Sequence, residues 1–202
     1  MHTYKLEEIE WTNIWREEAD KEGKPRVLLI GDSITQGYSS FVYRALDKKW
    51  SVTHLATSKC IDNPWLLEEI ILLGKQEKYD YVHFNNGIHG YSISDNEIYR
   101  EFYRNAVRTL RENFPGAKLS VATSTILCNL IDGKMEFAKF NETIIRRNEI
   151  VGEIAAEFGL QVDDLYAVAV NNIQYLSGDG VHYKAEGYQL LGKTVADFLM
   201  QL

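Results

Sequence analysis

A serine in a small polar turn follows an apolar run near the start of the sequence. The segment RVLLIGDSITQGY covers residues 26–38, and its apolar character ends at Gly31. Such a turn is typical of a phosphate-binding loop, a helix cap or a nucleophilic serine. A phosphate loop requires G-x-x-x-x-G-K-[ST], but here Tyr38 stands where lysine belongs and Asp32 would repel a phosphate. The helix cap by Asp32 or Ser33 and the nucleophile Ser33 remain as interpretations.

A nucleophilic serine needs a base, and the C-terminal part of the sequence offers one. Asp179 and His182 lie three residues apart in the glycine-rich segment YLSGDGVHYKAEGYQLLG, residues 175–192. At this spacing one turn brings the carboxylate to Nδ1–H of the imidazole, which leaves Nε2 free to act as a base. The nucleophile-elbow pattern G-x-S-x-G of the ordinary α/β-hydrolases does not occur in the sequence.

Apolar runs alternate with segments of helical periodicity, and this alternation indicates which elements position the candidate residues. The sequence predicts strands at 26–30, 51–56, 79–85, 117–125 and 160–166, and helices at 41–50, 64–75, 94–116, 137–159 and 185–201. The helix at 94–116 begins with a Ser-x-x-Glu capping box and ends at Pro-Gly. Strand–helix alternation requires crossover connections, which give a parallel sheet covered on both faces.

The predicted fold is therefore a single doubly wound α/β domain, residues 1–202, with a five-stranded parallel sheet. Residues 1–24 form an N-terminal extension, and we expect its helical stretch to pack its aromatic residues against the outside of this domain. In open α/β sheets ligands bind beyond the C-terminal ends of the strands. This rule directs attention to the loops after the five strands, where Ser33 and His182 both lie.

Composition and charge narrow the range of partners. The chain has 202 residues, 45% of them hydrophobic, and a formal net charge of −7. This charge gives no general attraction to nucleic acid or to anionic lipid, and no window approaches the ~18 continuous apolar residues of a membrane span. The acidic N-terminus has no apolar core of a signal peptide, which predicts a cytoplasmic protein, or a periplasmic or secreted one if a leader has been removed. The oligomeric state is not indicated.

The two ends of the sequence together resemble the SGNH (GDSL-type) hydrolases. GDS after the first strand and DGVH before the last helix look like blocks I and V of that family, and HYKAEGYQLLGKTVADFL is similar to its closing helix. The resemblance implies a flavodoxin-like three-layer sandwich. It also implies Ser33 as the nucleophile, His182 as general base and then acid, Asp179 as the residue that orients the imidazole, and no cofactor.

The oxyanion blocks depart from the family pattern. The family supplies a glycine amide after the second strand and an asparagine in a G-x-N-D block after the third. Here the loop after the second strand contains no glycine, so the amide of Ser58 or Lys59 is expected to serve. The block after the third strand reads NNGIHG, in which His89 holds the register of the asparagine and Asn86 keeps its chemistry. This variant resembles a branch of the family among carbohydrate esterases.

Other residues are candidates for the substrate pocket. Asp32, Tyr38 and Thr125 lie at the same predicted sheet edge as Ser33. His54 and His83 fall inside predicted strands, and the absence of HxH or HExxH spacing predicts that no metal is bound.

We therefore expect a metal-independent serine ester hydrolase that acts through an acyl-enzyme. Its expected small-molecule substrate is a short acyl ester, an acetyl ester, of a carbohydrate. Two alternatives remain open on the sequence. One is a thioesterase or lysophospholipase that uses the same three residues on longer acyl chains. The other is a carbohydrate-binding module without turnover.

Overall fold

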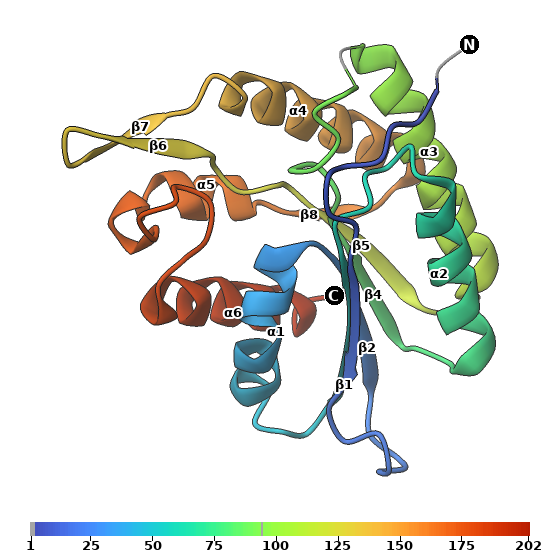
Figure 1. The fold of residues 1–202 in the computed structure, drawn as a ribbon. Coiled ribbons are helices and arrows are strands. Elements are labelled where there is room, and N and C mark those ends of the chain that lie inside the picture. Colours follow the sequence, from blue (N-terminus) through green and yellow to red (C-terminus); the bar gives the residue numbers. More distant parts are fainter. Residues whose placement is uncertain (1–2, 94) are drawn as a thin grey trace.

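The computed structural model describes residues 3–93 and 95–202, and a six-stranded sheet runs through the centre of the chain (Figure 1). The strand order is β1-β3-β2-β4-β5-β8. The strands are β1 (Thr12–Arg16), β2 (Arg26–Gly31), β3 (Ser51–Thr57), β4 (Tyr81–Phe84), β5 (Lys118–Ala122) and β8 (Gln161–Asp163). From β3 to β8 all neighbours are parallel, as predicted, whereas β1 pairs with β3 in the antiparallel sense.

Helices cover both faces of the sheet and form the outer layers of a three-layer sandwich (Figure 1). They are α1 (Ser33–Ala45), α2 (Pro64–Gln76), α3 (Asn96–Asn113), α4 (Asn141–Phe158), α5 (Leu165–Val170) and α6 (Ala185–Leu199), with a short 3-10 turn at Ile173–Tyr175. Two separate apolar cores result. One joins the sheet to α2, α3 and α4, and the other joins it to α1, α5 and α6.

Strand β2 shows why the central strands appear as continuous apolar runs. Successive side chains of a strand point to opposite faces of the sheet. Leu28 and Ile30 belong to the core under α2–α4, whereas Val27 and Leu29 belong to the core under α1 and α6. All four side chains are at most 1% exposed. A strand buried on both faces needs apolar residues at every position, and the predicted α/β fold class is confirmed.

The N-terminal extension differs from the prediction, because residues 12–16 form a strand and not part of a helix. Ile14 pairs with Leu55 and Trp15 with His54 across the β1–β3 ladder. Without β1, strand β3 would leave its backbone donors and acceptors unpaired along one edge, and β1 satisfies them. Trp15, one of the aromatic residues of this extension, is 57% exposed.

Three further differences concern the loops and helix starts. Helix α1 begins at Ser33, well before the predicted start, and the short helix α5 was not predicted. A hairpin of β6 (Cys128–Ile131) and β7 (Lys134–Phe137) interrupts the segment after β5, around an Asp-Gly turn that is a known hairpin signal. The predicted capping box falls on residue 94, outside the described residues, and Asp95 caps α3 by accepting a hydrogen bond from the amide of Glu97.

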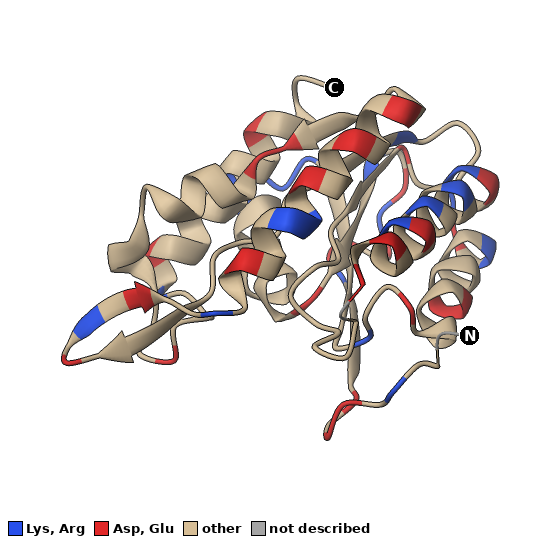
Figure 2. Cartoon of the chain, turned by 90° about the horizontal axis from the view of Figure 1, so that it is seen from above, with Lys and Arg blue, Asp and Glu red and all other residues tan. Residues whose placement is uncertain are grey.

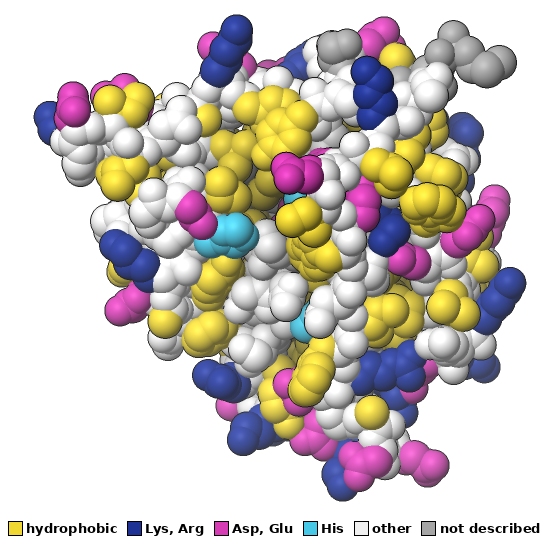
Figure 3. All heavy atoms as spheres, viewed as in Figure 1, with side chains coloured by type: hydrophobic (Ala, Val, Ile, Leu, Met, Phe, Trp, Pro, Cys, Tyr) yellow, Lys and Arg dark blue, Asp and Glu magenta, His cyan; other side chains and the backbone are white. Residues whose placement is uncertain are grey.

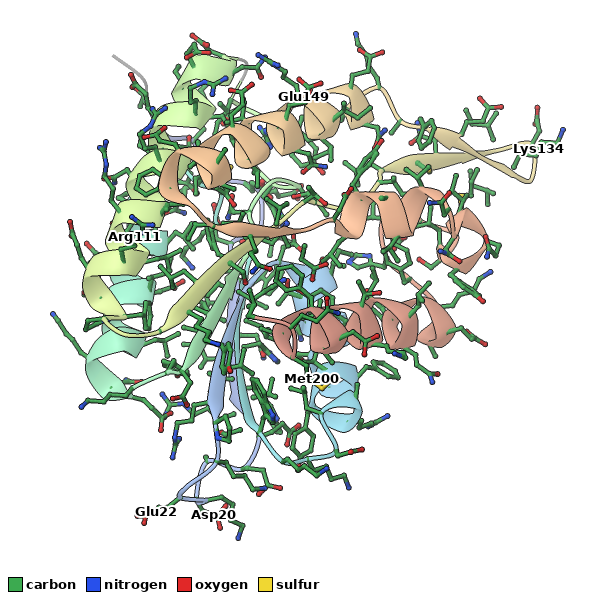
Figure 4. The ribbon with its side chains drawn as sticks, turned by 180° about the vertical axis from the view of Figure 1, so that it is seen from behind. Asp20, Glu22, Arg111, Lys134, Glu149 and Met200 are labelled. Carbon is green, nitrogen blue, oxygen red and sulfur yellow. The ribbon has the colours of Figure 1, made fainter. Side chains whose placement is uncertain are left out.

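Most charged residues lie on the outside of this framework. Figure 2 shows basic and acidic residues interleaved on the outer helices and at the tip of the hairpin. In Figure 4, Glu149 lies on the outer side of α4, and Arg111 of α3 lies beside the end of α4, where it donates to the carbonyl of Phe158. Lys134 lies at the tip of the hairpin, far from Asp20 and Glu22 in the turn between β1 and β2. Within the described ranges, no helix combines the length and apolar character needed to cross a bilayer.

Candidate active site

Ser33 is the first residue of helix α1 and follows directly after the buried strand β2. Asp32 is the N-cap, and its Oδ1 accepts a hydrogen bond of 2.9 Å from the amide of Ile34. The cap interpretation of the sequence therefore applies to Asp32. The first amides of a helix have no partner inside the helix and concentrate positive potential at its N-terminus. The hydroxyl of Ser33, which is partly exposed, lies in this potential.

The structure brings Ser33, His182 and Asp179 together at the sheet edge. His182 Nε2 is 2.9 Å from Ser33 Oγ, and His182 Nδ1 is 2.7 Å from Asp179 Oδ2. Because an ionised carboxylate only accepts hydrogen bonds, Nδ1 carries the hydrogen and Nε2 accepts the hydroxyl hydrogen of Ser33. The His182 side chain is 44% exposed, so the cluster is open to solvent.

Asp179 stays ionised because its surroundings favour the carboxylate. Partial burial acts to raise its pKa, but hydrogen bonds from Ser177 Oγ, from the amides of Val181 and His182 and from the imidazole outweigh burial and hold the pKa well below its ordinary value. Oδ1 receives the hydroxyl of Ser177 at 2.7 Å and the two amides at 3.0 and 2.9 Å. These contacts fix the loop around the carboxylate, and Oδ2 is left for the imidazole.

The loop after β4 carries the two predicted side-chain oxyanion donors, Asn86 and His89, and the two side chains have different surroundings. Asn86 is 7% exposed, and its Nδ2 donates to the carbonyl of Lys59 at 2.9 Å, so one of its amide hydrogens serves to join two loops. His89 is partly exposed, and its Nδ1 lies 3.0 Å from Glu7 Oε2. Ile88, the residue before His89, lines the same small cavity as Asp32, so this loop lies beside the nucleophile turn.

The prediction for Ser58 is wrong. Its amide donates to the carbonyl of Trp11 at 3.2 Å, and its hydroxyl donates to Glu10 Oε2 at 2.8 Å. The alternative amide, that of Lys59, donates to Thr57 Oγ1 at 3.2 Å. The bonds of Ser58 hold the N-terminal segment against the loop after β3, the bond of Lys59 lies within that loop, and both amides therefore already have an acceptor.

The predicted pocket residues Asp32, Tyr38 and Thr125 are buried, with exposures of 4%, 1% and 2%. They line a small cavity of about 10 Å³ together with residues of the first turn of α1, of the loops after β4 and β5 and of the start of α5. A cavity of this size holds about one water molecule. Their burial leaves these three residues little surface for a substrate, and their part in a substrate pocket stays a prediction.

Two contributions to the site were not predicted from the sequence. The root of the hairpin holds the Asp179–His182 loop, because the amide of Cys128 donates to the carbonyl of Gly180 at 2.8 Å. Glu7, from the N-terminal segment, contacts the loop after β4. An Asp-Gly pair signalled the hairpin turn, but nothing local to residue 7 indicates a partner 82 residues away.

An apolar surface adjoins the cluster. In the view of Figure 3, hydrophobic side chains (yellow) gather on the face between the hairpin and the centre of the molecule, with histidine (cyan) at the border of the gathering. Tyr91 is 59% exposed and stacks on Phe140, with ring centroids 4.5 Å apart. The side chains of Glu7 and Tyr91 also line one open surface cavity of about 380 Å³.

The parallel sheet, the two helical layers and a serine–histidine–aspartate cluster at the C-terminal strand ends together define a hydrolase of the SGNH class. The chain belongs to the GDSL-like Lipase/Acylhydrolase family, whose model matches residues 29–190. The predicted resemblance is thereby confirmed, and the protein is a carboxylic ester hydrolase that acts on small-molecule esters.

The similarity to solved structures of the same fold covers most of the chain. An acetyl xylan esterase, AlAXEase, is 20% identical, with a TM-score of 0.68 over 86% of this chain and 99% of that one. Est24, a carbohydrate acetylesterase from Sinorhizobium meliloti, is 17% identical, with a TM-score of 0.66 over 88% and 99%. Axe2, an acetylxylan esterase from Geobacillus stearothermophilus, is 17% identical, with a TM-score of 0.65 over 86% and 93%. No curated protein matches the chain.

Proposed function

We propose that the protein hydrolyses short acyl esters of carbohydrates, acetyl esters above all, through a Ser33–His182–Asp179 triad. The observation that carries the proposal is the continuous hydrogen-bonded path from Asp179 Oδ2 through the imidazole to Ser33 Oγ, at 2.7 and 2.9 Å. A serine hydroxyl becomes a useful nucleophile when an adjacent base takes its proton, and the carboxylate fixes the tautomer of that base.

The reaction follows from these positions. Nε2 of His182 takes the hydroxyl proton as Ser33 Oγ attacks the ester carbonyl. The tetrahedral intermediate expels the alcohol, which receives its proton from the imidazolium, and an acyl-enzyme remains. Water then attacks the acyl-enzyme with His182 again as the base, which releases the carboxylic acid and restores Ser33.

The negative charge of the intermediate needs hydrogen-bond donors, and two groups are proposed to contribute. The amide of Ser33 lies at the N-terminus of α1, where the helix favours an anion. His89 is the second donor, since its loop lies beside the nucleophile turn and Asn86 already donates to Lys59. Asn86 remains the alternative through its other amide hydrogen. Replacing the true donor should lower the kcat of the enzyme by about 10²–10³-fold, with KM little changed.

The carbohydrate acetyl ester is supported by similarity and by the surface of the site. Three structural neighbours are named as acetyl esterases of xylan or other carbohydrates. The exposed ring of Tyr91, on the open cavity of about 380 Å³, offers the apolar face that sugar rings contact. Rates on nitrophenyl esters from acetyl to decanoyl test this choice. We expect the highest kcat/KM for acetyl, and a preference for eight carbons or more would favour a thioesterase or lysophospholipase instead.

The first experiment compares the wild type with Ser33→Ala on p-nitrophenyl acetate. Removal of the nucleophile should lower kcat by about 10³-fold or more. Ser39→Ala is the matched control, because Ser39 lies two turns further along α1 and donates to the carbonyl of Gln36. Equal rates for the wild type and Ser33→Ala would refute the proposed function and leave the binding module as the interpretation.

A further inference from the structure

The carboxylate of Glu7 binds two groups of the loop that carries His89. Oε2 lies 3.0 Å from His89 Nδ1, and Oε1 accepts a hydrogen bond of 3.1 Å from the amide of Gly90. Glu7 belongs to the segment before β1, and its side chain is 25% exposed. This arrangement repeats the Asp179–His182 pair on a second histidine near the same nucleophile turn.

The same loop is held from its other side by Arg147 of α4. The guanidinium, which is 1% exposed, donates to the carbonyls of Gly87, His89 and Gly90 at 2.8, 2.6 and 2.8 Å. Gly90 has a φ of +81°, and a Cβ there would come within 2.1 Å of Cys60 Sγ. With its carbonyls bound to a cation, and an amide and an imidazole bound to an anion, the loop has little freedom to turn the ring of His89.

The hydrogen-bond roles follow from the ionised carboxylate, which only accepts. His89 must therefore donate through Nδ1, and Nε2 has no hydrogen-bond partner among the described residues. A neutral imidazole with its hydrogen on Nδ1 can only accept at Nε2, whereas an imidazolium donates at both nitrogens. His89 can thus donate to an oxyanion only as a cation, and the adjacent Glu7 carboxylate stabilises that cation.

We propose that Glu7 is a positioning residue that orients His89 through Nδ1 and stabilises it as the cation whose Nε2–H donates to the oxyanion. This inference rests on the proposed function and extends the site to the N-terminal segment. The charged and titratable groups around the loop are Glu7, Asp32 at the end of β2, Arg147 on α4, the thiol of Cys60, which donates to the His89 carbonyl, and Tyr91 in the loop itself.

Glu7 can be changed without releasing the segment, because other residues anchor it. Glu10 accepts the hydroxyl of Ser58, and the amide and carbonyl of Trp11 bond to Ser58 and Thr57. Glu7→Gln keeps the size of the side chain and removes the charge. Glu8→Gln is the matched control, since Glu8 is the exposed neighbour of Glu7 in the same segment.

On p-nitrophenyl acetate we expect Glu7→Gln to lower kcat by about 10–100-fold with KM little changed, which is less than the ~10²–10³-fold loss for removing the donor itself. The basic limb of its kcat/KM profile should move to lower pH, because the imidazolium loses the carboxylate that stabilises it. The acid limb, which reports the base His182, should stay in place. Glu8→Gln should match the wild type in both limbs.

A double-mutant cycle separates positioning from a structural role. If Glu7 acts through His89, then Glu7→Gln should change kcat by roughly twofold or less in a His89→Gln background. An undiminished loss in that background would overturn the proposal, because Glu7 would then act through the fold and not through His89. Unchanged kcat and an unchanged basic limb in Glu7→Gln alone would overturn it as well.

Nitrogen-15 spectra of the histidine rings test the pairing without turnover. With His89→Gln to assign the signal, His89 of the wild type should be protonated on Nδ1, and its proton should be lost at lower pH in Glu7→Gln. A His89 signal that is identical in the two proteins would refute the pairing. If the His89 signal is identical in the two proteins but turnover still requires Ser33, only the role of Glu7 is refuted. If turnover does not require Ser33, the proposed function is refuted as well.

Discussion

At the scale of single residues, the candidate site consists of two histidines that each pair with a carboxylate. Asp179 holds His182 with Nε2 toward Ser33 Oγ, and Glu7 binds His89 at the neighbouring loop. The chemistry asked of the two imidazoles is opposite, since a base must be neutral and a donor through Nε2 must be charged. In the proposed mechanism this difference, rather than the number of histidines, decides the pH range of activity.

Asp179→Asn tests the role of the first carboxylate. An amide can donate to Nδ1, which favours the wrong tautomer of His182, and we expect kcat on p-nitrophenyl acetate to fall about 10³–10⁴-fold. Ser177→Ala is the control, since it removes one hydrogen bond from Oδ1 and leaves Oδ2 with the imidazole. We expect Ser177→Ala to lose less than about tenfold. Similar losses of kcat in the two variants would mean that the loss comes from a disturbed loop and not from the wrong tautomer of His182.

At the scale of elements, the loop before α6 depends on the root of the hairpin. Gly180 has a φ of +73°, and a Cβ there would come within 2.0 Å of the carbonyl oxygen of Cys128. Hence the hairpin backbone, which contacts the loop through the amide of Cys128, sets the distance at which His182 approaches Ser33. An element that carries none of the three residues thus positions two of them.

Gly180→Ala should therefore disturb both stability and turnover. We expect the free energy of unfolding to fall by about 1–3 kcal/mol, from backbone strain and the displaced carbonyl, and kcat to fall about tenfold or more as the imidazole moves. Gly178→Ala is the control two residues away, where a Cβ meets no atom within 4 Å. Denaturant unfolding and initial rates measure the two effects. Equal behaviour of the two alanine variants would show that the hairpin does not hold the loop.

At the scale of the whole molecule, β1 completes the sheet and encloses a histidine. His54 on β3 pairs with Trp15 of β1 in register, and its Nε2 lies 2.7 Å from Asn13 Oδ1. Burial lowers the pKa of His54 to about 4. The unfolded chain binds a proton at this group near pH 6.5, so it holds more protons than the folded protein between the two values.

The free energy of unfolding should consequently decrease as the pH is lowered from about 6.5 to about 4, and His54 should account for roughly 3 kcal/mol of this decrease at most. The contribution of His54 to stability is fully present above the pKa of the unfolded state, about 6.5, and is lost as the pH falls toward the pKa of the folded state, about 4. His54→Gln cannot titrate, so urea unfolding across this range should show a smaller pH slope by up to one proton. The other titrating groups are common to both proteins, and identical slopes would contradict the assignment.

Periodicity and burial account for what could be predicted of the fold. The five parallel strands and the long helices were predicted because each must present apolar residues at its own spacing, a property that a short window of sequence contains. Strand β1 was not, since TNIWR is mostly polar and becomes a strand only where the edge of β3 is available. Ser58 failed as an oxyanion donor for the same reason, because the segment that takes up its amide arrives from a distant part of the chain.

The sequence by itself determined the fold class and three candidate residues, because Ser33 and the Asp179–His182 pair stand at the ends of elements whose order alone brings them to one edge of the sheet. Only the tertiary structure decided that Asp32, Tyr38 and Thr125 turn inward, that the hairpin root holds the Asp179–His182 loop, and that Glu7 binds His89. These contacts join segments far apart in the chain through single hydrogen bonds. No periodic pattern encodes such bonds, so they appear only when the segments pack together.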